Sequence, residues 1–154
     1  MRPLGFVVAA FILFSAPALA QKPGSADPGK SSAKPAAPAE EAFKKAEAFG
    51  EKNNFVEAMR WYRVAADQGH LESQNNVGMF YVAGMGVKKD VAEGARWLRK
   101  AADRGHDVAQ RNLGFLYLQG IGVPKDRAEA IRWLHKAADQ GDEEAKSVLK
   151  KLGQ

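Results

Sequence analysis

The chain has 154 residues, of which 45% are hydrophobic, and it contains no cysteine. This length is sufficient for one domain, and the lack of cysteine excludes a disulfide framework and any thiol nucleophile. The formal net charge of +5 falls to +2 for the part that follows residue 39, because Arg2, Lys22, Lys30, Lys34 and Asp27 all precede it. Such a weak balance is no electrostatic footprint for nucleic acid, so we expect no nucleic-acid partner.

Residues 1–20 have the pattern of a secretory signal peptide. Arg2 supplies a positive start, residues 4–14 are almost wholly apolar, and Ala18-Leu19-Ala20 is a small-x-small cleavage site. The apolar run is too short to span a bilayer comfortably, which disfavours an uncleaved anchor. We therefore expect cleavage after Ala20, a periplasmic or secreted protein, and no stable membrane insertion afterwards.

Residues 21–39 have the composition of a disordered linker. Four prolines lie among Ala, Ser, Gly and Lys, with no aromatic and no large aliphatic residue. A segment of this kind cannot bury enough apolar surface to offset the entropy lost on ordering.

Residues 40–154 repeat themselves at a fixed step, which is shown by the even spacing of Trp61, Trp97 and Trp133. The glycines Gly69, Gly105 and Gly141 share this spacing. A period as long as the interval from Trp61 to Trp97 is typical of stacked helical repeats, in which each unit buries its apolar face against the next. The repeats divide into units at about 41–69, 70–105 and 106–141, followed by a terminal segment, 142–152.

One helix of each unit begins at an Asx residue that is followed three positions later by Glu. These helix starts, which resemble capping boxes, are Asn54, Asp90 and Asp126. Each of these B helices runs to the repeated glycine, where a left-handed residue can end it. The other helices, the A helices, are predicted over 71–83 and 107–119. The recurrence of Gly78 and Gly114 within them predicts a close approach of the B helix backbone.

The A and B helices are joined by Gly-x-Gly-Val loops at 84–87 and 120–123. Their glycines suit left-handed turns, and each Val is expected to tuck beneath its loop. From Ser73 to Gly105, and again in the next period, these features resemble the Sel1-like repeat family, a branch of the tetratricopeptide superfamily. The resemblance covers about residues 41–152 and implies an all-α fold, an α-α superhelix of helix pairs. It also implies an adaptor or regulator that binds other proteins.

Both ends depart from the repeat pattern. The first unit lacks the long loop, since Ala46 and Ala58 are closer in sequence than Gly78 and Gly94. At the other end Lys150 replaces the repeated glycine, and its side chain would block a further B helix. The segment 142–152 is therefore predicted to be a capping helix.

We expect no metal, no cofactor and no enzymatic activity. His70 and His106 occupy equivalent positions, but the third equivalent is Asp142, and all three follow a helix-ending glycine. This position favours a helix N-cap over a metal site. His135 is expected to be a solvated residue. The sequence contains no nucleophile elbow and no His-Glu-x-x-His motif.

The candidate site is the side of the A helices that faces away from their partner B helices. Apolar and amide side chains recur there at helical spacing, and such a stripe can form a partner groove on the concave face. The same stripe can equally be buried between successive A helices, and the sequence leaves both alternatives open. The candidate residues are Asn75, Asn76, Met79, Val82, Arg111, Asn112, Phe115 and Leu118.

These features predict a protein-protein interaction module that binds a protein or peptide partner in the cell envelope. The alternative is a protein that binds peptidoglycan or another envelope polysaccharide, with aromatic rings stacked on sugars. All three Trp residues lie on B-helix packing faces, which disfavours that alternative.

Overall fold

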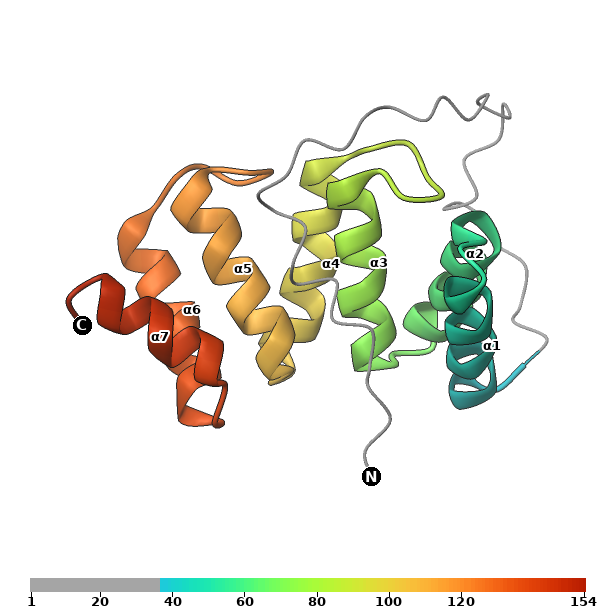
Figure 1. The fold of residues 1–154 in the computed structure, drawn as a ribbon, viewed down its shortest axis with the longest axis horizontal. Helices are drawn as coiled ribbons and strands as arrows, with labels where there is room; N and C mark the ends of the chain where they lie inside the picture. The colour runs from blue at the N-terminus through green and yellow to red at the C-terminus, as the bar shows by residue number, and fades with distance from the viewer. Residues whose placement is uncertain (1–36) are drawn as a thin grey trace.

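The computed structural model describes residues 37–154, which form seven helices and no strand. The helices follow one another along the long axis of the molecule, from α1 and α2 at one end to α7 at the other (Figure 1). This arrangement confirms the predicted all-α superhelix of helix pairs. The helices are α1 (Ala39–Glu51), α2 (Phe55–Asp67), α3 (Leu71–Ala83), α4 (Val91–Asp103), α5 (Asp107–Gln119), α6 (Arg127–Asp139) and α7 (Glu143–Lys151).

The predicted signal peptide and most of the predicted linker lie outside the described residues. The described chain starts at Ala37, which is buried and whose carbonyl accepts a hydrogen bond of 2.9 Å from Gln68 Nε2. Helix α1 begins at Ala39, so it includes the last residue assigned to the linker. No helix among residues 37–154 has the length and apolarity needed to cross a membrane.

The B helices α2, α4 and α6 begin at the predicted N-caps. The side chains of Asn54, Asp90 and Asp126 accept hydrogen bonds from the backbone N–H three residues later, at 3.3, 2.9 and 3.0 Å. In a full capping box, the Glu side chain would also accept the backbone N–H of the capping residue. In the two later units a backbone carbonyl accepts that N–H instead. There the N–H groups of Asp90 and Asp126 donate to Tyr81 O and Tyr117 O, both at 3.0 Å, which frees the following Glu side chains for other bonds.

The A helices α3 and α5 and the capping helix α7 begin at His70, His106 and Asp142. Nδ1 of each histidine accepts a backbone N–H at 3.2 Å, and the Asp142 carboxylate does the same at 2.7 Å. The predicted structural role of these residues as N-caps is thereby confirmed.

The glycines within the A helices mark close helix crossings, as predicted. A Cβ placed on Gly78 would lie 2.7 Å from Leu98 Cγ and 3.0 Å from Gly94 O, so α3 and α4 pack with their backbones almost touching. At the equivalent Gly114 a Cβ would lie 2.9 Å from Leu134 Cγ of α6. No side chain larger than hydrogen fits at these crossings unless the helices separate.

Each long A-to-B loop folds back over the start of the preceding B helix. Gly86 has a φ of +63°, and a Cβ there would lie 2.2 Å from Phe55 O in the first turn of α2. Gly122 repeats this contact with Val91 O in α4 at 2.0 Å. At the start of α6, the last B helix of residues 37–154, Arg127 Nη2 donates to Leu152 O at 2.8 Å. Every B helix is thus held at its start by the segment that comes after it.

The Trp residues of the second and third units lie between cations. Arg63 of α2 and Lys100 lie 4.7 and 4.3 Å from the Trp97 ring, whose Nε1 donates to Glu93 Oε1 at 2.8 Å. Arg99 and Lys136 cover Trp133 in the same way. His135 corresponds to Arg63 and Arg99 and is exposed.

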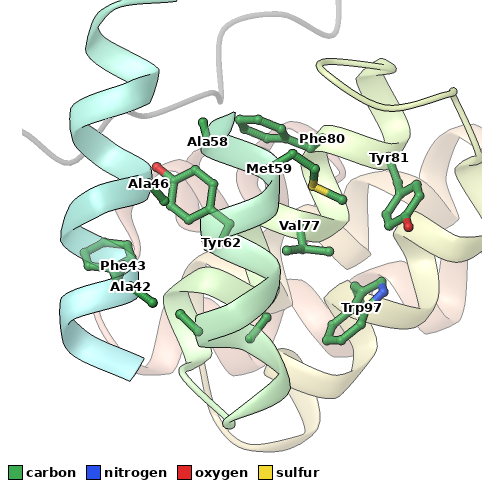
Figure 2. Packing of buried hydrophobic residues seen from close by; sticks show 12 residues of the cluster. Ala42, Phe43, Ala46, Ala58, Met59, Tyr62, Val77, Phe80, Tyr81 and Trp97 are labelled. Carbon is green, nitrogen blue, oxygen red and sulfur yellow. The ribbon is translucent and has the colours of Figure 1, made fainter. Parts of the chain in front are cut away.

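The first hydrophobic core joins α1, α2 and α3. Tyr62 lies 6.0 Å from Phe43 and 5.5 Å from Phe80 between ring centroids, and Ala46 and Ala58 are fully buried between α1 and α2 (Figure 2). Lysines replace core residues of the repeat in both the first and the last described helix. Lys45 takes the place of the buried Val77 and lies 4.7 Å over the Trp61 ring, and Lys150 is exposed on α7.

Candidate interaction surface on the A helices

The eight predicted residues fall into two groups. Four are buried, which for these residues favours the alternative of packing between successive A helices. Four remain partly exposed. The buried group is Asn75, Met79, Arg111 and Asn112, and the partly exposed group is Asn76, Val82, Phe115 and Leu118.

The buried polar side chains join neighbouring A helices. Asn112 Nδ2 of α5 donates to Asn75 Oδ1 of α3 at 2.9 Å. Arg111 of α5 forms an ion pair of 2.6 Å with Asp142, the N-cap of α7, and its Nε lies 3.4 Å from Glu144 Oε2. The side chains of Arg111 and Asp142 are 8% and 4% exposed, so the buried charge of Asp142 depends on Arg111 for compensation. These contacts hold the A helices in a fixed register.

Asn76 belongs to a polar cluster between α1, α2 and α3. It lies near Tyr62 of α2 and acts to lower the pKa of the Tyr62 hydroxyl. Burial raises the pKa of Tyr62, and the nearby carboxylates of Glu47 and Glu72 raise it further. Burial also raises the pKa of Glu47, with added repulsion from Glu72, Glu51 and Glu40 in that order. Carboxylates from α1 and α3 therefore both act on Tyr62.

The apolar side chains of the predicted stripe differ in how closely they pack against the hydrophobic core. Met79 is part of the second core cluster, Val82 packs against that cluster, and Leu118 packs against the third. Phe115 belongs to none of the three clusters of the described chain, although it is only partly exposed. Phe115 is thus the large apolar side chain of this stripe with the least internal packing.

Other kinds of site find little support among residues 37–154. No three His, Asp or Glu side chains converge there in an arrangement that could hold a metal ion. The rings of Trp97 and Trp133 are each only 4% exposed and are covered by cations, so neither offers a free face for a sugar.

The sequence interpretation missed the carboxylates of this surface. Glu40, Glu47 and Glu51 are spaced at i, i+7 and i+11, which places them along one side of α1. That spacing was the available signal. The contribution of Glu72 from α3 depends on how α1 and α3 are placed, which the sequence does not give.

This architecture defines a helical-repeat protein whose A helices present one continuous face. The chain belongs to the Sel1 repeat family, since the model of that repeat matches residues 46–70, 71–106 and 107–142. Sel1 repeats generally act as protein-protein interaction modules and are typically non-enzymatic scaffolds.

Solved structures agree with this assignment. A Sel1 repeat protein from Oxalobacter formigenes is 39% identical, with a TM-score of 0.67 over 73% of this chain and 88% of that one. The protective antigen c5321 of uropathogenic Escherichia coli strains, which displays an SLR fold, is 35% identical with a TM-score of 0.66. That match covers 70% of this chain, which spans only 24% of the antigen.

A third structure supports the fold alone. It is cysteine rich protein B of Helicobacter pylori, with 22% identity and a TM-score of 0.58 over 71% of this chain and 93% of that one. No curated protein matches the chain.

Proposed function

We propose that this protein is a periplasmic or secreted interaction module, an adaptor or regulator that binds a protein or peptide of the cell envelope. Binding takes place on the concave face lined by the A helices. The observation that carries the proposal is the position of Phe115, which is partly exposed on this face and lies outside every core cluster. An aromatic side chain of this kind is a frequent anchor in protein interfaces.

The surroundings of Phe115 suit a binding surface. Leu118 lies on the same side of α5 and is also partly exposed. Val82 is predicted from the sequence to face away from the B helices, but its Cγ2 lies against Gly94 of α4, where a Cβ would be only 2.6 Å away. The Asn75–Asn112 hydrogen bond and the Arg111–Asp142 ion pair fix the helices below this surface. A partner would therefore meet a preformed surface, and little ordering entropy would oppose binding.

The decisive variant is Phe115→Asp in the mature chain. We expect loss of partner capture from envelope extract with little loss of helicity, because Phe115 lies outside the core clusters. Val56→Asp is the matched control, since Val56 is a large exposed hydrophobic residue, 38% exposed, on α2. Met79 is unsuitable for this test because it is buried, and a carboxylate there would disrupt the fold. Equal capture by both variants and the unchanged chain would contradict the proposed face.

The proposed location has its own test. We expect the mature protein in the periplasmic or secreted fraction to begin at Gln21, which intact-mass spectrometry would detect. An unprocessed chain in the cytosolic fraction would refute the export proposal.

The polysaccharide alternative is tested by sedimentation with purified peptidoglycan, from which we expect no retention because the Trp97 and Trp133 rings are covered.

A further inference from the structure

The A-helix face changes its chemistry from one end of the array to the other. At the level of Phe115, the four A helices carry Glu47 in α1, Met79 in α3, Phe115 in α5 and Lys151 in α7. This register follows from the repeat step and from the correspondence of Ala46 with Gly78 in the shorter first unit. The row thus runs from a carboxylate through the buried Met79 and the partly exposed Phe115 to an ammonium group.

The carboxylates at the α1 end are only partly neutralised within residues 37–154, by Lys44, which pairs with Glu40 and acts to lower the pKa of Glu47. Glu40 lies 3.4 Å from Lys44 and 3.6 Å from His70, whereas Glu47, Glu51 and Glu72 have no ion-pair partner there. Glu47 is partly buried, and burial together with its acidic neighbours raises its pKa. Mutual repulsion of these groups would be relieved by a cation placed among them.

The α5 part of the face offers no free cation. Its Arg111 is buried, paired with Asp142 and close to Glu144. Beyond it, α7 ends in Lys150 and Lys151, which are exposed. The face therefore combines an apolar centre with negative charge on one side and positive charge on the other.

We infer that the partner is an extended segment of protein whose Lys or Arg residues lie over α1 and α3 while an aromatic or branched side chain contacts Phe115. This inference rests on the proposed function and names the class of partner. Directly packed helices lie about 8–10 Å apart, and successive A helices pack less closely than this, so two steps from α1 to α5 cover roughly 20 Å or more. An extended chain spans that distance with about six residues at ~3.3 Å each. Lys150 and Lys151 disfavour the opposite orientation by repulsion.

Selection of a random dodecapeptide phage library on the mature chain tests this inference without assuming a partner. We expect enriched peptides to carry two or more Lys or Arg residues and an apolar anchor about six positions away. Enrichment of neutral or acidic peptides, or no enrichment at all, would overturn the inference.

The selected peptides are then measured against two charge-matched double variants. Glu47→Gln with Glu72→Gln should weaken binding about tenfold, since it removes the partly buried charge of Glu47 and the exposed charge of Glu72 beside the proposed ligand position. Asp103→Asn with Asp139→Asn removes the same charge from exposed B-helix ends and should leave affinity within about twofold, as expected for distant screened charges. Equal effects of the two double variants would overturn the inference.

The two proposals fail in different ways. If Phe115→Asp abolishes capture of the envelope partner while Glu47→Gln with Glu72→Gln does not, the face binds a partner of another chemistry. If Phe115→Asp has no effect on capture, the proposed face itself is wrong.

Discussion

Replacement of Gly78 by Ala sets two known effects against each other at one position. Ala is the better helix former, and inside a helix this exchange is worth about 1 kcal/mol of stability where space allows. At Gly78 the new Cβ would lie 2.7 Å from Leu98 Cγ and 3.0 Å from Gly94 O. Leu98 is fully buried, and Gly94 O belongs to the backbone of α4, so neither atom can move without displacing the helix.

The clash should outweigh the gain in helix propensity. Overpacking of this kind costs about 1–3 kcal/mol, and the short distances at Gly78 place it near the upper end. The expected net loss is therefore about 1–2 kcal/mol, which corresponds to a fall in melting temperature of roughly 4–8 °C for a domain of this size. Gly114→Ala should be milder, because its contacts with Leu134 Cγ and Ala130 O are 2.9 and 3.2 Å.

Gly50 supplies the matched control. It lies in α1, and a Cβ there would meet nothing within 4 Å. Gly50→Ala should therefore stabilise the protein by about 0.5–1 kcal/mol through helix propensity alone. Urea and thermal unfolding followed by far-ultraviolet circular dichroism would give the order Gly50→Ala, unchanged chain, Gly114→Ala, Gly78→Ala. A Gly78→Ala variant as stable as Gly50→Ala would refute the close helix crossing.

Two further predictions concern the starts of the A and capping helices. Arg111→Ala should cost about 3 kcal/mol because it leaves the buried Asp142 carboxylate without its cation, and hydrogen exchange should show α7 opening first; unchanged protection of α7 would contradict this. Burial lowers the pKa of His106 below its usual 6.5, although Asp107 and Glu72 oppose this shift and His70 adds to it. The folded state therefore binds fewer protons than the unfolded state, so stability is complete above about pH 6.5 and falls as the pH drops through the lowered pKa. His106→Asn keeps a capping side chain and cannot titrate, so its urea midpoint should change less between about pH 7.5 and pH 5 than that of the unchanged chain. Identical pH profiles would exclude His106 as the titrating group.

The fold was largely predictable because its signals are local. Helix starts depend on an Asx or His side chain that caps a backbone N–H three residues away. Asn54, Asp90 and Asp126 were therefore enough to predict where the B helices begin. The predicted helices 71–83 and 107–119 agree with α3 and α5. The predicted close crossing at Gly78 could be read from the recurrence of a glycine inside a helix.

The surface was less predictable because it depends on contacts between units. Asn75 and Asn112 bond across neighbouring A helices, and Arg111 reaches Asp142 from the next helix. Whether such polar side chains are buried depends on the curvature of the stack, and helical periodicity alone gives no measure of that curvature. The bonds of Glu93 and Glu129 could not be predicted from the sequence for the same reason. Tyr81 O and Tyr117 O accept the N–H groups of the capping residues, so these Glu side chains are left to bond Trp97 and Trp133.

The loops that fold back over the preceding B helices give the array a direction. The loop at Gly86 completes the first helix pair, the loop at Gly122 completes the second, and the carbonyl of Leu152 completes the third. During synthesis the first helix pair therefore lacks its loop contact until the following residues have been added. A chain truncated at a unit boundary would lack this contact in its final pair. Completion of the helix pairs therefore follows the order of synthesis, and each pair becomes complete only when part of the next unit has been added.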